Sequence, residues 1–374
     1  MTGRTGPSRL DGWIIWPLAM ISVASVINLV SAGQTIAGRP VWISQVVAIA
    51  VGAVIFGIVS LVDLKSIERW AYWLYATGIL VLASVHFVGY SAGGAKSWLR
   101  LGPVGLQPSE PMKIILIITL ARLLVRQGLE RPVGLSSLPK ILALALPPLA
   151  LILKEPDVGT AVIYATMIGT LILFAGIDTT LKRLAAGSMI LVIGGLSFYV
   201  FILDRDPLQH LKAHHRKRLV ALVDLESDPK GVGYQQIQAK IAIGSGGTGG
   251  LGWMRGRQSQ FAYVPKQHTD FAFCVLAEEW GFTGALAVIT CFWILILRGA
   301  AAARESRDPF GTLLCVGVVS LLFWHMVINL GMNLAVMPVI GIPLPVISAG
   351  GSSVLTLFAG MGIIAAVYRD RFHF

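Results

Sequence analysis

Charge is scarce in this 374-residue sequence, and the scarcity decides its class. Asp, Glu, Lys and Arg together make up 13% of the chain, about half of the roughly 25% typical of soluble proteins. Hydrophobic residues make up 55%. So few charges cannot cover a water-facing surface, which excludes a soluble globular protein and the disordered and collagen-like classes. The composition is typical of a membrane protein with many transmembrane segments.

Cysteines are also few, and none is placed for a disulfide or a metal. Cys274, Cys291 and Cys315 all lie inside apolar runs, and no pair has the CxxC spacing of a zinc or redox site. We interpret them as small core residues and exclude a disulfide scaffold.

Long apolar runs, in contrast, are frequent. A membrane core about 30 Å thick needs about 20 apolar residues per helix, and the chain offers about ten such stretches. We predict an all-α polytopic integral membrane protein, a single domain over residues 1–374, with one long extracytoplasmic loop at 204–270. The predicted spans are 13–32, 42–62, 70–89, 110–125, 138–153, 159–177, 184–203, 271–297, 310–335 and 351–368.

Positive charge is unevenly divided between the segments that join these spans. With a cytoplasmic N-terminus, the inner segments carry fifteen Lys and Arg and the short outer segments carry five. The positive-inside rule then places both termini in the cytoplasm and the long loop outside the cytoplasmic membrane. Contacts with anionic lipid account for much of the net charge of +11. No basic stripe interleaved with aromatic residues indicates nucleic acid.

Charges at membrane depth cost at least about 2.5 kcal/mol each, and they gather in the outer half. Glu110 and Lys113 begin the fourth span and are close enough on one helical face to pair. Ser109 could cap that helix. A cap does not account for Lys113, a cation where the helix dipole disfavours it; a solvated cavity or an anionic ligand does. Two further acidic pairs are Glu155 with Asp157, and Glu278 with Glu279.

The long loop contains two weak ligand patterns. His210, His214 and His215 lie near Arg218, but no acid or cysteine completes a metal-binding spacing, so a basic stretch at the lipid headgroups is favoured. The glycine segment, residues 244–252, includes a literal GxGxxG. It lacks the surrounding βαβ unit of a dinucleotide-binding fold. Its glycines would still let backbone N–H groups approach an anion such as phosphate.

His268 and Asp270 lie where the long loop meets the eighth span. Asp270 could simply cap that helix. The pair also stands at the boundary of water and membrane, where it could handle a proton on a lipid-attached substrate.

Together these segments resemble the SEDS family (shape, elongation, division and sporulation), bacterial membrane proteins that polymerise peptidoglycan glycan strands. Residues 258–260 and 338–343 are more similar to the elongation members than to the division members. The motifs that carry the resemblance span almost the whole chain: Lys96-Ser97-Trp98, Gln107-Pro108-Ser109-Glu110, Gly233-Tyr234-Gln235, Ile243-Gly244-Ser245-Gly246-Gly247, His268-Thr269-Asp270-Phe271, Gly341-Ile342-Pro343-Leu344-Pro345 and Ser348-Ala349-Gly350-Gly351-Ser352-Ser353.

Two positions depart from the family pattern. Glu155 stands where family members usually carry Gln, and Ala349 stands where they usually carry Tyr. The first adds a negative charge beside Asp157.

The resemblance implies a glycosyltransferase reaction on lipid II. The C4 hydroxyl of an acceptor sugar attacks the anomeric carbon with inversion, and undecaprenyl pyrophosphate leaves. Asp270 is implied as the catalytic base, and a divalent cation, Mg or Mn, or protein cations would stabilise the leaving group. A class B penicillin-binding protein is the implied partner. The implied substrate-binding residues are Lys96, Arg100, Glu110, Lys113, Asp157, Arg218 and His268.

Two other classes remain as alternatives. A transporter or flippase of lipid-linked precursors would also show interrupted helices and charges at membrane depth, although no inverted repeat is evident and the charges gather on the outer side. A non-catalytic scaffold would leave the glycine segment and Asp270 without a role.

Overall fold

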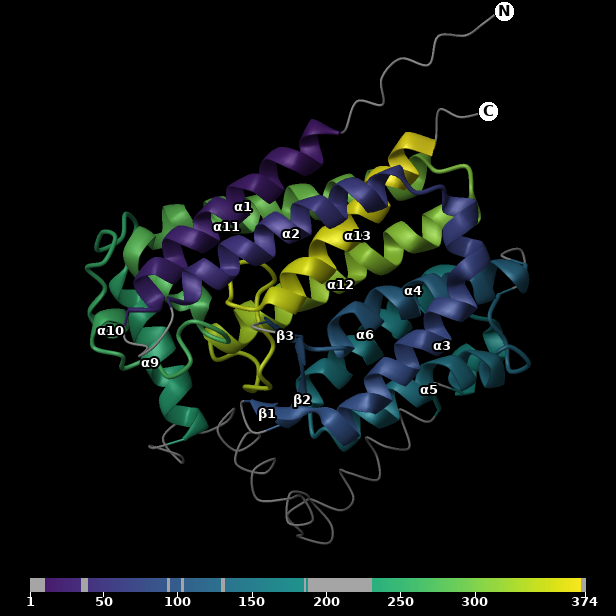
Figure 1. Cartoon of the computed structure of the whole chain (residues 1–374), viewed down its shortest axis with the longest axis horizontal. Coiled ribbons are helices and arrows are strands. Elements are labelled where there is room, and N and C mark those ends of the chain that lie inside the picture. The colour runs from purple at the N-terminus through teal and green to yellow at the C-terminus, as the bar shows by residue number, and fades with distance from the viewer. Residues whose placement is uncertain are drawn as a thin grey trace, which may run out of the picture.

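The computed structural model describes residues 11–34, 40–92, 95–101, 104–128, 132–184, 186–187 and 231–370, which form a helical bundle with one small sheet (Figure 1). Nine of the ten predicted spans correspond to helices. Almost all of the predicted span 184–203, together with Arg218 and the loop histidines, lies outside the described residues. The nine helices are α1 Gly12–Ala32, α2 Val41–Leu61, α3 Leu64–Val88, α4 Ser109–Arg126, α5 Leu138–Lys154, α6 Val158–Ala175, α11 Ala272–Glu305, α12 Pro309–Asn333 and α13 Gly351–Asp370.

Seven of these helices are long and apolar enough to cross a membrane: α1, α2, α3, α6, α11, α12 and α13. Of the other two, α4 has 18 residues and includes Glu110, Lys113, Arg122 and Arg126, and α5 has 17 residues. Both pack inside the same bundle, α4 against α3 and α5 against α6. The predicted all-α polytopic membrane fold is confirmed.

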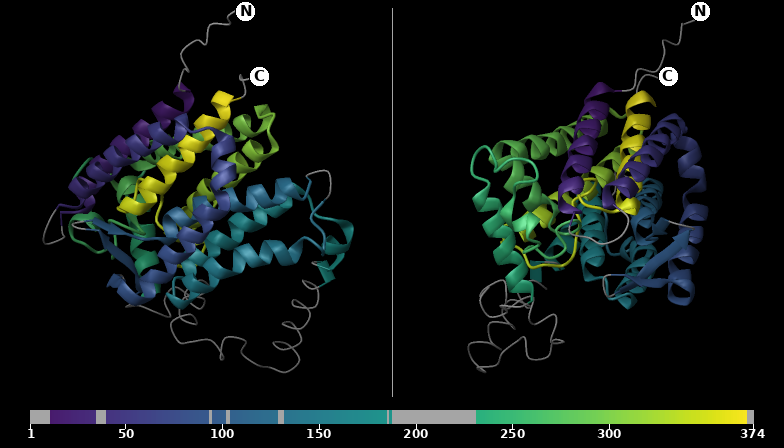
Figure 2. Two further views of the ribbon diagram at one scale, coloured as in Figure 1. Left: turned by 45° about the vertical axis from the view of Figure 1, so that its right-hand side comes forward. Right: turned by 60° about the vertical axis from the view of Figure 1, so that its left-hand side comes forward.

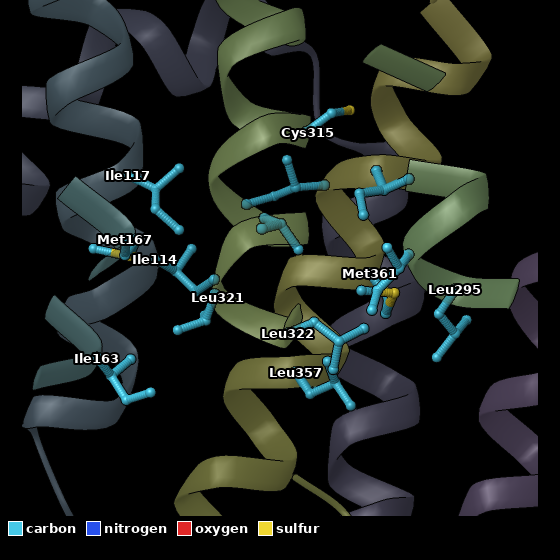
Figure 3. Close-up of a cluster of buried hydrophobic side chains, with 14 of the residues drawn as sticks. Ile114, Ile117, Ile163, Met167, Leu295, Cys315, Leu321, Leu322, Leu357 and Met361 are labelled. Atoms are coloured by element: carbon cyan, nitrogen blue, oxygen red, sulfur yellow. The ribbon is translucent and has the colours of Figure 1, made fainter. Parts of the chain in front are cut away.

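α12 and α13 form the centre of the bundle. α13 packs along α2, and α12 contacts α11, α6 and α4. Figure 3 shows the apolar layer that they share, where Ile117 of α4, Met167 of α6, Leu321 of α12 and Met361 of α13 converge. Because lipid is as apolar as these side chains, close packing rather than the hydrophobic effect holds such helices together.

The two ends of the bundle differ. The first turn of α1 and the last turn of α13 lie at one end, and the helices α9 (Val232–Ser245) and α10 (Arg257–Gln260) lie toward the other, which we call the loop end (Figures 1 and 2). A three-stranded antiparallel sheet, absent from the sequence prediction, lies there too. It consists of β1 (Tyr90–Ala92), β2 (Ala95–Leu101) and β3 (Val104–Leu106), in that order.

α11 is interrupted at Gly281, and the glycine segment provides hydrogen-bond partners for backbone groups on both sides of the break. Gly281 has φ 66° and ψ −165°, outside the helical region. The carbonyl groups of Glu278 and Glu279 accept the N–H groups of Leu251 and Gly252, both at 3.0 Å, and two N–H groups beyond the break donate back to the segment. Backbone groups released by a break at membrane depth need such protein partners because hydrocarbon offers none.

This pairing corrects the expected role of the glycine segment. N–H groups of residues 250–252 donate to protein carbonyls instead of facing an anion. Only glycine fits at two of these positions without a clash. A Cβ on Gly246 would lie 2.0 Å from the carbonyl oxygen of Ala277, and one on Gly250 would lie 2.2 Å from that of Glu279. The segment is therefore a structural part of the bundle.

The two acidic side chains of α11 also have structural partners. Glu278, fully buried, accepts the backbone N–H groups of Gln258 at 2.7 Å and Ser259 at 3.1 Å, so it holds the start of α10. Glu279 accepts the hydroxyl of Ser31 in α1. Unlike the midplane charges of a transporter, both carboxylates tie the loop end to the helices around it.

Replacing Gly250 by Ala should destabilise the protein by about 1–3 kcal/mol, because the backbone there has φ +81° and the new Cβ would overlap Glu279. Gly249→Ala is the matched control, since a Cβ on Gly249 meets nothing within 4 Å. Thermal unfolding in detergent measures both. Equal melting temperatures for the two variants would contradict this account of the segment.

Candidate functional site

Lys113 and Glu110 form a buried ion pair on the first turns of α4. The Lys113 Nζ lies 2.7 Å from the Glu110 Oε1, and the two residues are 1% and 5% exposed. The pairing predicted from their spacing is confirmed. Ser109 is the first residue of α4 and makes no capping bond, so the alternative in which it only caps the helix is wrong.

His325 of α12 completes this group. Its Nε2 lies 3.0 Å from the Lys113 Nζ, and its Nδ1 lies 3.2 Å from the carbonyl oxygen of Pro343. A carbonyl only accepts, so we assign the ring proton to Nδ1, which leaves Nε2 to accept from the ammonium. A cavity of about 20 Å³ adjoins the group, which is room for about one water. Lys113 thus lies beside a small cavity, with its charge already paired.

Asp270 lies in the loop that precedes α11. Its carboxylate is mostly buried, and the Oδ2 lies 3.5 Å from the Nζ of Lys266. α11 starts at Ala272, and its N-cap position, Phe271, has no side-chain cap. Asp270 therefore does not cap the helix, and its carboxylate is available beside a cation.

Two asparagines of α12 hold the backbone of Asp270. The Asn329 Nδ2 donates to the carbonyl oxygen of Asp270 at 2.9 Å and to that of Ile342 at 2.7 Å, and the Asn333 Nδ2 donates to Asp270 at 3.3 Å. Both asparagines are fully buried. These bonds join the loop that contains Asp270, which we call the site loop, to residues 338–350, which we call the α12–α13 segment.

His268 is held by the same segment. Its carbonyl oxygen accepts the N–H of Ala349 at 2.8 Å. Since this bond uses only the backbone, the alanine in place of the family's tyrosine leaves it intact. Burial lowers the pKa of His268; the neighbouring Asp270 opposes this shift and Lys266 adds to it. The imidazole is therefore neutral at neutral pH.

The α12–α13 segment also contacts α6, the helix that Asp157 precedes. A Cβ on Gly159 would lie only 2.3 Å from the carbonyl oxygen of Ile340. Asp157 caps α6, with its carboxylate accepting the N–H of Thr160 at 2.9 Å and the hydroxyl at 2.8 Å. It also accepts the side-chain amide of Gln107 at 3.1 Å. One segment thus borders the Lys113 group, the Asp270 loop and the Asp157 cap.

Glu155, two residues before Asp157, is 2% exposed, and both of its carboxylate oxygens are buried without a hydrogen-bond partner. Burial, with a smaller contribution from the Asp157 charge, raises the pKa of Glu155 to about 7.

Of the predicted cationic residues, Arg100 is not brought into this group. It is exposed on β2, with its guanidinium 5.2 Å from the ring centroid of Tyr90. Lys96 is also on β2, where its backbone pairs with Ser91; its side chain and the whole of Arg218 lie outside the described part of the chain. Sequence reasoning instead missed Lys266, the cation beside Asp270.

It also missed the polar face of α12. His325, Asn329 and Asn333 recur every four residues in an otherwise apolar helix, so they lie on one face. That spacing of polar residues in an apolar helix could have predicted buried polar side chains with a function.

An apolar cavity of about 270 Å³ lies between α9, α11 and α12. α9 lines it through Ile243, α11 through Phe273 and Ala277, and α12 through Leu330 and Leu334. Leu330 and Leu334 directly follow Asn329 and Asn333 in the sequence, so α12 both lines the cavity and holds the backbone of Asp270.

A model of the FtsW, RodA and SpoVE family of cell cycle proteins matches residues 10–373. The chain belongs to this family. It is 37% identical over 355 residues to the peptidoglycan glycosyltransferase MrdB of Escherichia coli strain K12, covering 95% of this chain and 92% of the relative.

Solved structures of the family have the same fold. A structure described as the coordination of polymerization and crosslinking by a peptidoglycan synthase complex matches with a TM-score of 0.81 and 28% identity, covering 98% of this chain and 99% of that one. The rod shape determining protein RodA of Thermus thermophilus matches with a TM-score of 0.68 and 29% identity over the same shares. The chain is therefore a multi-pass membrane enzyme of the peptidoglycan glycosyltransferase class.

Replacing Glu155 by Gln should stabilise the protein at alkaline pH. The raised pKa means that the folded state holds the proton more tightly than the unfolded chain, so stability is highest below the usual carboxyl pKa and falls as pH rises through about 7. The variant should melt higher than the parent at about pH 8, by about 2–4 °C for each kcal/mol, and not at about pH 4.5. Thermal unfolding of both proteins, with a metal chelator in the buffer, measures this difference in melting temperature. A rise of equal size at both pH values would contradict the prediction.

Proposed function

We propose that this protein polymerises lipid II into glycan strands at the outer face of the cytoplasmic membrane. The observation that carries the proposal is a carboxylate, Asp270, kept free of helix capping at the loop end and placed beside Lys266. Its loop is held by α12, a helix that also lines an apolar cavity. The similarity to a protein named rod shape determining supports the elongation branch of the family. The even number of predicted spans and the common end of α1 and α13 agree with both termini on one side of the membrane (Figure 1), and the excess of Lys and Arg in the inner segments supports the cytoplasmic side.

Asp270 would act as the base. A sugar hydroxyl is a weak nucleophile, and a positioned carboxylate that takes its proton contributes about 10²- to 10⁴-fold in rate. The contacts of Asn329 and Asn333 fix the backbone of Asp270 and leave its Oδ atoms for the acceptor hydroxyl. The neutral imidazole of His268, two residues earlier, would hydrogen-bond the sugar.

Negative charge gathers on the departing pyrophosphate, and cations placed nearby lower the barrier. Lys266 is half-exposed and positioned for this. Lys113 already contacts Glu110 and His325, so we propose that it positions the α12–α13 segment rather than contacting the substrate. Lys96 and Arg100 on the sheet and Arg218 remain candidates for binding the headgroup.

The chemistry of the site fits a divalent cation. Glu155 has two orphaned carboxylate oxygens, and Asp157 is close enough to raise its pKa. These two residues would hold Mg or Mn, which would neutralise charge on the pyrophosphate.

The apolar cavity supports a lipid-linked donor. It has the size and lining to hold part of an isoprenoid chain, and α12, which holds the backbone of Asp270, forms part of its wall. A donor anchored there would have its pyrophosphate at the mouth of the cavity, near Lys266.

A class B penicillin-binding protein is the proposed partner. The support is the similarity to a chain of a peptidoglycan synthase complex that coordinates polymerization with crosslinking. Such a partner would cross-link the strands that this protein makes.

Asp270→Asn should abolish glycan polymer while the protein stays folded, because an amide takes no proton from the acceptor. Purified protein, with and without the penicillin-binding partner, is incubated with lipid II and a divalent cation, and polymer is resolved on a gel. Asp63→Asn, an exposed acid ahead of α3, should polymerise normally. Wild-type turnover by Asp270→Asn would remove Asp270 from the mechanism; lipid II that crosses a proteoliposome without polymer would indicate a flippase.

A further inference from the structure

Glu155 is a buried acid that the protein itself does not satisfy. The residue is 2% exposed, and neither carboxylate oxygen has a hydrogen-bond partner. A buried carboxylate is normally paired, hydrogen-bonded or bound to a metal. Each orphaned acceptor in a folded protein needs such an explanation.

The surroundings of Glu155 are negative. Asp157 acts on it through its charge, and Tyr164 of α6 lies within electrostatic reach of Glu155, Asp157 and Glu110 together. The hydroxyl of Tyr164 donates to the carbonyl of Ser109 at 2.7 Å, which places the start of α4 in the same region. The ammonium of Lys113 pairs with Glu110, so it does not balance the other two acids.

A second orphaned acceptor lies in this region. The hydroxyl of Ser109 is buried without a partner, and the residue is 1% exposed. Three unsatisfied oxygens therefore lie where these helices begin or end: that of Ser109 at the start of α4 and two of Glu155 between α5 and α6, where the carboxylate of Asp157 also lies. The region has an excess of hard oxygen atoms and of negative charge, which is the environment that Mg²⁺ and Mn²⁺ select.

Asp157 retains capacity for a ligand. A carboxylate has about four lone-pair sites, and Asp157 uses three, for the N–H and hydroxyl of Thr160 and the amide of Gln107. Glu155 uses none. The bonds to Asp157 fix its orientation, as outer hydrogen bonds do for metal ligands.

We infer that Glu155 and Asp157 form a divalent-cation site, at which Mg²⁺ or Mn²⁺ would be shared with the pyrophosphate of the lipid-linked donor. The inference rests on the proposed function for the identity of the donor. Mg²⁺ characteristically binds one or two carboxylates together with substrate phosphates rather than a complete protein cage. Among the described residues no group of three or more His, Cys, Asp and Glu side chains could hold a metal, so the pyrophosphate and water would supply the remaining ligands.

Glutamate at position 155 would give this chain one more ionised ligand than the glutamine of the family pattern. A carboxylate binds a hard dication more strongly than an amide oxygen does, because it adds a full charge to the same geometry. This protein should therefore bind its cation more tightly than its own Glu155→Gln variant, in which the side chain keeps its shape.

The test measures Mn²⁺ binding to the full-length protein without substrate, by the loss of the free-ion electron paramagnetic resonance signal up to millimolar Mn²⁺. Wild type should bind one ion, and Glu155→Gln should weaken its affinity by about tenfold or more. Asp157→Asn, whose amide oxygen can still cap α6, should also weaken binding. Asp63→Asn should bind as wild type does.

Unchanged affinity in folded Glu155→Gln, or no binding by wild type, would overturn the site. Asp270→Asn separates the two proposals, because it should keep Mn²⁺ binding and lose polymerisation. Polymerisation by wild type without Mn²⁺ binding at Glu155 would leave the proposed function standing and refute the cation site. Binding at Glu155 in a protein that never polymerises lipid II would refute the proposed function alone.

Discussion

The side-chain amide of Asn329 is the contact on which the site depends. Both of its N–H groups are used, one on the carbonyl of Asp270 and the other on the carbonyl of Ile342. It is fully buried, where an unmade hydrogen bond costs about 1–3 kcal/mol. A single side chain of the central helix therefore fixes the position of the site loop relative to the α12–α13 segment.

The buried ion pair of Lys113 and Glu110 also helps to fix the α12–α13 segment, through His325. Lys113 cannot leave Glu110 without exposing a bare charge, at a cost of about 3–5 kcal/mol. With its place fixed, Lys113 orients His325, and His325 holds Pro343, the residue after Ile342. The α12–α13 segment is thus held at adjacent residues by two polar side chains one helical turn apart. A loop at membrane depth, which would otherwise be costly, becomes a rigid support for Asp270.

Much of the fold could be predicted from sequence because membrane helices are encoded locally. The importance of the segment around Asp270 is inferred from the resemblance to the family, whereas the spans and the pairing of Glu110 with Lys113 follow from residues within a few turns of each other. The sheet, the packing of the glycine segment into the break of α11 and the partners of Asp270 do not. His325 meets Lys113 across 212 residues and Asn329 meets Asp270 across 59, and no local pattern specifies such partners. The polar face of α12 indicates only that partners exist.

The measurement that tests this account most directly is the steady-state polymerisation kinetics of Asn329→Ala. If Asn329 positions the catalytic loop, kcat should fall by about 10²-fold, the cost of a misplacement of about 1 Å, with little change in KM. Ser320→Ala, another buried polar position on α12 whose hydroxyl bonds only within its own helix, is the control and should keep both constants. A folded Asn329→Ala protein with wild-type kcat would contradict the claim that α12 positions Asp270.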